Sequence, residues 1–395
     1  MTSPSAPLEA VPAGSPTRYR LLSADDHVQE PPDLWIKRLS RAKFGDRIPS
    51  LARQADGSER WVVDGQLIPL RGAGMGAALF ADRTTEPQCW ADVPPMVRDP
   101  SERLKAMDAD GVEASVLYPT VAGVGGEAFG RITDPELELA CVQAYNDWLI
   151  EEWAAVSDRF VPQCLVPLDP PEAAAEIRRA VAMGHRGVIY PGIPMDLREV
   201  AHINDPVYDP IWATCQELGI PLCFHAGAST SNQLSPYAGF SPAVSGALEG
   251  LTRPTSTAVV LVNFLLSGIL LRFPGMRVVF AESALGWAAY LLEYTDHQFE
   301  NDKVRYEGQG FPLRPSELFR RQCYLTGWYD RVTMKVRDHL GVENILWCTN
   351  FPQATSSWPR SREIVDSWAT GVPARERDRI VWNNAAELYR LGPTD

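Results

Sequence analysis

The chain carries eight short apolar runs that recur along most of its length. Most of these runs are continuous and do not alternate with polar residues, which is typical of parallel strands covered on both faces. We therefore predict eight parallel strands, over Tyr19–Ala24, Ala114–Tyr118, Phe160–Val166, Gly187–Tyr190, Ile220–Phe224, Arg277–Ala281, Gln322–Thr326 and Asn344–Thr349.

Segments of helical character lie between most of these runs. Several begin near a proline or an acidic residue and end beside a glycine or proline, such as Gly219, as expected at helix boundaries. The alternation predicts an α/β fold, a closed (β/α)₈ TIM-like barrel. An open doubly wound sheet is the alternative, but it usually has a glycine-rich phosphate loop where this chain has Asp25, Asp26 and His27. The predicted helices are Pro135–Ala155, Pro171–Met183, Pro206–Leu218, Ala258–Phe273 and Leu285–Glu300.

Two long segments interrupt the alternation, and each follows the C-terminal end of a strand. Gln29–Ser101, after the first strand, contains a hairpin-like stretch over Trp61–Leu70, and Ala226–Arg253 is rich in glycine, serine and proline. Barrel enzymes build their sites from such segments. We expect a disordered tail over residues 1–17 and a single barrel domain over residues 18–395.

Net charge and cysteine content indicate which binding partners and which cellular compartment to expect. The formal charge of −13 disfavours nucleic acid and anionic membranes as partners, so we expect a small-molecule substrate, with a homodimer left open. The seven cysteines include no C-x-x-C pair and the N-terminus lacks an apolar signal region, which favours a cytoplasmic protein. The strongest apolar run, Ala258–Leu271, is too short to span a bilayer.

Polar side chains gather at the ends of four predicted strands. Asp25 and His27 lie two residues apart, so in a strand they point to the same side. Together with His225, at the end of the fifth strand, they would give three protein ligands for one divalent metal. Glu282 and Asn350 follow the sixth and eighth strands. For Asp25 and His27 alone, the alternative is a surface aspartate beside a hydrogen-bonded histidine.

The segment Ser23–Trp35 resembles the opening of the amidohydrolase-related family, whose members include metal-dependent decarboxylases, hydratases and hydrolases. Further segments carry the resemblance through most of the chain, and they imply a (β/α)₈ barrel with a site on its C-terminal face. They are Arg103–Val112, Tyr145–Trp148, Pro221–Gly227, Phe280–Ser283 with Gly286 and Trp287, and Trp382–Tyr389.

The end of the eighth strand departs from the family's pattern. The family has S-D-x-P-H there, and this chain has Thr349, Asn350, Phe351, Pro352 and Gln353. The resemblance implies that the lost aspartate contacts the metal and accepts a proton from the attacking water. An amide has no useful basicity and is a weaker metal ligand, and Gln353 lacks the imidazole. We therefore expect a zinc-like divalent metal at a weakened site of Asp25, His27 and His225, or no metal.

These observations lead to a main functional hypothesis and two alternatives. The first is an enzyme with a degenerate metal site that performs non-hydrolytic acid–base chemistry, as a lyase, decarboxylase, isomerase or cyclase. The alternatives are a metal-dependent decarboxylase or hydrolase, and a catalytically inactive binding barrel. The predicted catalytic residues are Glu282, His27, Asp25 and His225. The predicted substrate-binding residues are Asn350, Gln353, Trp287 and Trp328.

Overall fold

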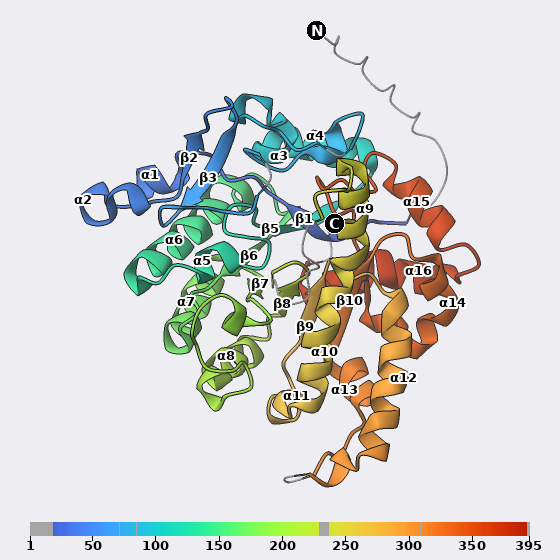
Figure 1. The fold of residues 1–395 in the computed structure, drawn as a ribbon. Coiled ribbons are helices and arrows are strands. Elements are labelled where there is room, and N and C mark those ends of the chain that lie inside the picture. The colour runs from blue at the N-terminus through green and yellow to red at the C-terminus, as the bar shows by residue number, and fades with distance from the viewer. Residues whose placement is uncertain (1–18, 71, 84, 229–236, 308–309, 393–395) are drawn as a thin grey trace.

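The computed structural model describes residues 19–392 except residues 71, 84, 229–236 and 308–309. In this part of the chain, eight parallel strands form one sheet that is nearly closed as a barrel, and each strand pairs with the next along the sequence (Figure 1). The predicted TIM-like barrel is therefore confirmed. The strands are β1 (Leu22–His27), β5 (Ala114–Tyr118), β6 (Phe160–Leu165), β7 (Gly187–Ile189), β8 (Leu222–His225), β9 (Val278–Ala281), β10 (Cys323–Gly327) and β11 (Ile345–Trp347).

Backbone hydrogen bonds close the barrel between its first and last strands. The amide of Asn350 donates to the carbonyl of Asp25 over 3.1 Å, and the amide of His27 donates to the carbonyl of Phe351 over 2.7 Å. Both bonds involve residues just beyond the end of β11. The residues that follow the last strand are therefore fixed against the end of the first.

Helices cover the outside of the barrel (Figure 1). The helix predicted over Pro135–Ala155 is α-helical to Trp148 and continues as a π-helix to Ala154. The one predicted over Ala258–Phe273 is split at Ser267 and Gly268, where glycine has a positive φ of 80°. The main helices are α6 (Pro135–Trp148), α7 (Pro170–Met183), α8 (Asp209–Leu218), α10 (Thr257–Leu266), α11 (Ile269–Arg272), α12 (Gly286–Asn301), α13 (Pro315–Gln322), α14 (Arg331–Leu340), α15 (Ser361–Trp368), α16 (Ala374–Asp378) and α17 (Asn384–Leu388).

The boundaries predicted for the first strand are shifted. The prediction of Tyr19–Ala24 stops before the acidic residues, whereas β1 runs from Leu22 to His27 and all six of its residues are buried. An apolar-run criterion ends at a charged residue, but here the charged residues are inside the barrel. The catalytic candidates therefore belong to the strand itself.

The long segment between β1 and β5 forms short helices and a small antiparallel sheet. The hairpin expected over Trp61–Leu70 corresponds to the antiparallel pair of β3 and β4. The elements are α1 (Leu34–Arg38), α2 (Arg41–Phe44), β2 (Ser50–Arg53), β3 (Glu59–Val63), β4 (Gln66–Leu67), α3 (Pro95–Arg98) and α4 (Pro100–Asp110).

After β8 the chain forms α9 (Pro242–Thr252), a helix that the glycine- and serine-rich composition did not predict. The expected disordered tail, residues 1–17, lies outside the described residues, and the single-domain organisation stays a prediction. Across the part of the chain that is described, no helix combines the length and apolar character needed to cross a membrane.

Candidate active site

The C-terminal half of β1 presents Asp25 and His27 to the barrel interior. The pairing of β1 with β5 shifts register between Ser23 and Asp26, so the strand is locally irregular where its polar residues begin. Asp26 is fixed by neighbouring elements, because it accepts hydrogen bonds from the hydroxyls of Ser115 (2.5 Å) and Thr349 (2.5 Å). Asp26 thus joins β1, β5 and the end of β11 and stays apart from the cluster that Asp25 forms.

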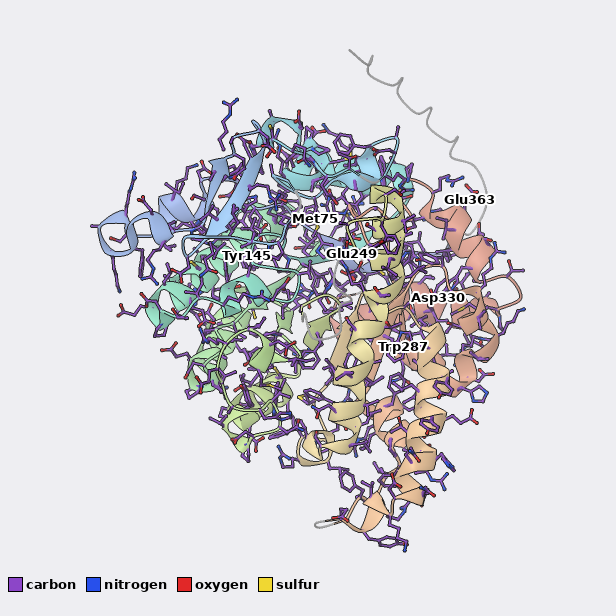
Figure 2. The ribbon with its side chains drawn as sticks, in the orientation of Figure 1. Met75, Tyr145, Glu249, Trp287, Asp330 and Glu363 are labelled. Carbon is purple, nitrogen blue, oxygen red and sulfur yellow. The ribbon has the colours of Figure 1, made fainter. Side chains whose placement is uncertain are left out.

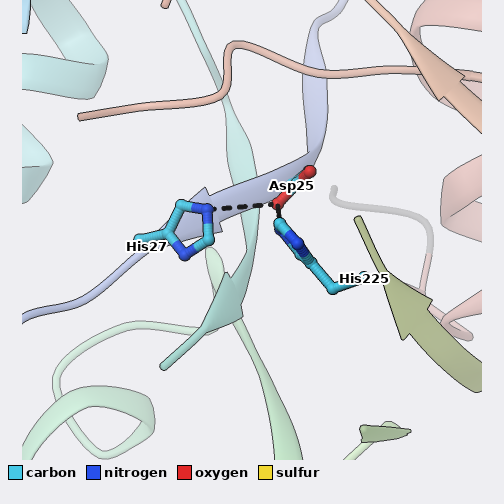
Figure 3. Close-up of side chains that lie close together, drawn as sticks. All are labelled: Asp25, His27 and His225. Carbon is cyan, nitrogen blue, oxygen red and sulfur yellow. Dashed lines mark ion pairs between the residues drawn. The ribbon is translucent and has the colours of Figure 1, made fainter. Parts of the chain in front are cut away.

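Asp25, His27 and His225 form a compact buried cluster (Figure 3). One oxygen of Asp25, Oδ1, lies 3.7 Å from Nε2 of His27 and 3.4 Å from Nε2 of His225. One potential ligand atom from each of the three residues lies within 4.8 Å of the others. The structure therefore brings together the three residues predicted as metal ligands.

Backbone carbonyls fix which nitrogen of each imidazole faces the cluster. Nδ1 of His27 lies 3.2 Å from the carbonyl oxygen of Pro119, and Nδ1 of His225 lies 2.7 Å from that of Ala226. A carbonyl oxygen only accepts hydrogen bonds, so in both rings Nδ1 carries the proton. Both Nε2 atoms are thereby directed at Asp25, the arrangement that metal-binding histidines commonly use.

The two histidines differ in their preferred charge. Burial lowers the pKa of His27 to about 4, and the nearby Asp25 carboxylate only partly offsets this. Burial also disfavours a charge on His225, but the carboxylates of Asp25 and Glu282 outweigh it and raise its pKa to about 9. In the absence of a metal, the cluster near neutral pH therefore combines a neutral His27 with a protonated His225.

Several buried atoms around the cluster have no hydrogen-bond partner within the described residues. They are both carboxylate oxygens of Asp25, Nε2 of His225 and Oδ1 of Asn350. Buried polar atoms usually have a hydrogen-bond partner, so these atoms need an explanation, and a bound ion is one. Two imidazoles, a carboxylate and an amide oxygen suit a divalent cation such as zinc or manganese. The three predicted ligands are intact, which favours a metal-dependent enzyme over a degenerate metal site.

Glu282 and Asn350 form a buried pair next to this cluster, at the ends of β9 and β11. Nδ2 of Asn350 donates to Oε1 of Glu282 over 3.1 Å and to Oγ1 of Thr355 over 2.9 Å. These two acceptors turn the remaining atom of the amide, Oδ1, away from them. Burial raises the pKa of Glu282, and the charges of Arg253 and His225 oppose that rise.

Both members of this pair have a backbone with positive φ. Glu282 has a φ of 50° and Asn350 a φ of 56°, in the left-handed region. Asparagine tolerates this region, whereas for glutamate it costs about 1–3 kcal/mol and persists only where the surroundings enforce it. The turn after Glu282 is held by Asp330, whose carboxylate accepts from the amide of Leu285 over 2.5 Å. Strain of this kind is concentrated at functional sites.

The other predicted substrate-binding residues lie close to this pair or to His27. Nε2 of Gln353 lies 3.0 Å from Nε2 of His27. The buried indole of Trp328 donates to the carbonyl of Thr355 over 3.1 Å, and the partly buried indole of Trp287 donates to the carbonyl of Ser283 over 2.7 Å (Figure 2 labels Trp287). Their roles in binding substrate stay predictions.

Sequence reasoning missed two residues of the site. The ring of Tyr118, the last residue of β5, lies 5.1 Å from that of His225 and 6.0 Å from that of His27. The strand-end rule that selected the other residues applied to Tyr118 as well. Nη1 of Arg253 lies 3.9 Å from Oε2 of Glu282. Its only signal in the sequence is its place at the end of the long segment after His225.

The chain is similar to known proteins over most of its length. A family model described as amidohydrolase matches residues 59–391. The gamma-resorcylate decarboxylase of Rhizobium radiobacter is 25% identical over 306 residues, which cover 73% of this chain and 86% of that relative.

Solved structures show the same fold. An amidohydrolase from Mycobacterium avium subsp. paratuberculosis superimposes with a TM-score of 0.74 at 20% identity, over 94% of this chain and 100% of that one. A dihydroxybenzoic acid decarboxylase from Polaromonas sp., solved with manganese and the inhibitor 2-nitroresorcinol, gives a TM-score of 0.65 at 19% identity, over 95% of this chain and 98% of that one.

Proposed function

This chain belongs to the amidohydrolase family, and from that premise we propose that it is a divalent-metal-dependent decarboxylase of a hydroxylated aromatic carboxylic acid. The observation that carries the proposal is the buried cluster of Asp25, His27 and His225, with its unpartnered ligand atoms. The substrate class comes from similarity, since a curated relative is a gamma-resorcylate decarboxylase. A structural neighbour that binds manganese is a dihydroxybenzoic acid decarboxylase.

Asp25, His27 and His225 would hold the metal, with Oδ1 of Asn350 as a neutral oxygen donor beside them. A divalent cation bound there would orient and polarise oxygen atoms of the substrate. Asp25 supplies the negative charge of the ligand set. The bonds of His27 and His225 to backbone carbonyls hold both rings in the orientation that metal binding requires.

Decarboxylation requires one proton at the ring carbon that loses its carboxylate. As the carbon–carbon bond breaks and carbon dioxide leaves, that carbon takes up a proton, and the donor is then reprotonated from solvent. Glu282 is the residue that we assign as this proton donor. Its Oε2 is buried, has no hydrogen bond among the described residues, and lies 3.8 Å from Nδ1 of His225.

Asn350 favours decarboxylation over hydrolysis. A hydrolase needs a base that removes a proton from the attacking water, and an amide has no useful basicity. Decarboxylation uses no attacking water, so the amides at positions 350 and 353 do not obstruct it. Without a bound metal, Asn350 donates to Glu282 and Gln353 lies within hydrogen-bonding distance of His27.

A substrate screen tests this proposal. Protein stripped with a chelator and reloaded with Mn²⁺ or Zn²⁺ would be incubated with a panel of hydroxybenzoic acids. Release of carbon dioxide and formation of the matching phenol would be measured by chromatography. We expect at least one acid to be decarboxylated only by the metal-loaded protein. Hydrolysis of esters or amides, with no carbon dioxide from any acid, would show that the chain is a hydrolase.

A further inference from the structure

The segment after His225 contains two charged residues in 28 positions, Glu249 and Arg253 (residues 226–253). They lie four residues apart, the spacing that places side chains on one face of a helix. Nη2 of Arg253 donates a hydrogen bond to Oε1 of Glu249. Figure 2 shows Glu249 on α9, near the middle of the view. In a segment that has no other charged residue, Arg253 is therefore placed near the barrel mouth and is hydrogen-bonded to Glu249.

The end of α9 lies against the Glu282 side of the site. A Cβ atom at Gly250 would be 3.8 Å from Thr355, the residue that accepts a hydrogen bond from Asn350. A Cβ atom at Gly227 would be 3.3 Å from Cδ of Arg253. Gly227 has a φ of 87°, which glycine adopts without strain. The backbone beside His225 therefore leaves room for the stem of Arg253.

One amino group of Arg253 is engaged and the other faces the active site. Nη1 lies 3.9 Å from Oε2 of Glu282, which is beyond hydrogen-bonding distance. That oxygen has no other hydrogen bond within the described residues. The Arg253 side chain is 25% exposed. If Arg253 only stabilised the end of α9, its ion pair with Glu249 would be sufficient. Its second amino nitrogen, Nη1, is instead directed at Glu282 in the active site.

The charges in the site indicate what Nη1 of Arg253 can bind. An aromatic acid approaching the metal ligands meets the carboxylate of Asp25, which repels its own carboxylate. The charge of Arg253 acts on both Glu282 and His27, so it offsets that repulsion where the substrate must bind. A planar guanidinium also matches the geometry of a carboxylate better than a point charge does.

On the premise of the proposed function, we infer that Arg253 is a specificity-determining residue. It binds the carboxylate of the aromatic acid through Nη1, the guanidinium nitrogen that lies 3.9 Å from Glu282. Glu249 is then the positioning residue that holds Arg253 in place.

Binding measurements made before turnover test this inference separately from the proposed function. Mn²⁺-loaded protein would be mixed with pairs of ligands that differ only in the carboxylate, 2,6-dihydroxybenzoate with resorcinol and salicylate with phenol. Dissociation constants would be taken from rapid-mixing tryptophan fluorescence. We expect the acids to bind more tightly than the phenols. Arg253→Gln should weaken acid binding about 10- to 100-fold, as for loss of a hydrogen bond to a charged group, and change phenol binding less than about twofold.

Two further variants complete the design. Arg253→Lys keeps the positive charge but loses the planar guanidinium, so it should weaken acid binding less than Arg253→Gln does. Arg305→Gln breaks a comparable ion pair, with Glu300 on the remote end of α12, and should leave both affinities unchanged. The inference is overturned if the wild type does not prefer the acid in either pair, or if Arg253→Gln and Arg253→Lys weaken acid and phenol equally. If acids bind in an Arg253-dependent way but release no carbon dioxide, the decarboxylase proposal fails and the binding role of Arg253 stands.

Discussion

The two sides of the active site differ in how their polar atoms are used. The ligand side, consisting of Asp25, His27 and His225, has buried donor atoms without hydrogen-bond partners in the described structure. On the amide side, consisting of Glu282, Asn350 and Gln353, each side chain makes a hydrogen bond to another residue of the site. The ligand side therefore offers its buried atoms to a metal, whereas the amide side combines internal hydrogen bonds with two unpartnered oxygens, Oε2 of Glu282 and Oδ1 of Asn350.

This contrast shows where the capacity for proton transfer remains. Amides keep the hydrogen bonds of the acid and imidazole they replace, but they do not titrate. Glu282 is the one carboxyl group of the amide side, and its strained backbone shows that the surroundings hold it in place. Metal binding and proton transfer are thus assigned to different residues of one site, and variants can address them one at a time.

The largest effect is expected on the ligand side. Asp25→Asn removes the anionic ligand while keeping the size of the side chain. Metal affinity should fall by more than about 100-fold, above the roughly 10- to 100-fold cost of losing an outer hydrogen-bond partner. Elemental analysis after dialysis measures this, with Asp56→Asn, an exposed aspartate, as the matched control. An Asp25→Asn protein that keeps a full equivalent of metal would mean that the ligand side is misassigned.

Glu282→Gln tests the amide side. Its expected effect is of similar size, but it is measured as a fall in kcat and not as a loss of metal affinity. Its side-chain carbonyl can still accept the hydrogen bond from Asn350, so the site should keep its shape. Loss of a positioned proton donor costs about 10²–10⁴-fold in rate, and we expect kcat to fall within that range while metal content stays unchanged. The kinetics and the metal content would be measured on the same sample. Near-native turnover, alongside inactive His27→Asn, would make Glu282 a structural residue.

Asn350→Asp places a carboxylate where Nδ2 now donates to Glu282 over 3.1 Å. In metal-free protein this replaces a hydrogen bond with repulsion, so the free energy of unfolding should drop by about 1–3 kcal/mol. Metal loading should recover the loss, because a cation offsets the added charge. Thermal denaturation with and without Mn²⁺ measures both effects.

The control for this variant is the double mutant Glu282→Gln with Asn350→Asp, in which an amide again faces a carboxylate. Its stability should return toward that of the wild type, so the two changes should not be additive. If the two effects simply add, then Glu282 and Asn350 do not act as a pair.

The barrel and the grouping of the three ligand-side residues could be predicted from the sequence, for physical reasons. Buried parallel strands are recognisable as continuous apolar runs, and two residues that are two apart on a strand share a face. That spacing placed Asp25 and His27 together, and the end of the fifth strand supplied His225. The same criterion ended the first strand too early, because it treats Asp25 and His27 as surface residues when they are buried.

The amide side depends on contacts that no local pattern encodes. The approach of Arg253 to Glu282 requires knowing where α9 lies, and its composition had not indicated a helix. The bond between Gln353 and His27 joins residues 326 positions apart and depends on the closure of the barrel. Sequence reasoning identified the unusual residues at positions 350 and 353, but not which groups they face.

The smallest expected effect concerns the contact between the two sides. Nε2 of Gln353 donates a hydrogen bond to Nε2 of His27. A metal would bind through the same lone pair of His27. The Gln353 side chain must therefore move away from His27 when a cation binds. A hydrogen bond contributes about 0.5–1.5 kcal/mol net, so Gln353→Ala should tighten metal binding by about 2- to 10-fold. Calorimetric titration of metal-free protein with Mn²⁺ measures this. Gln54→Ala, which removes an amide bonded to a backbone carbonyl elsewhere, is the control and should change nothing. Weaker binding in Gln353→Ala would mean that the amide turns its oxygen to the metal. Gln353 would then be a metal ligand in addition to Asn350, and its contact with His27 would not compete with the metal.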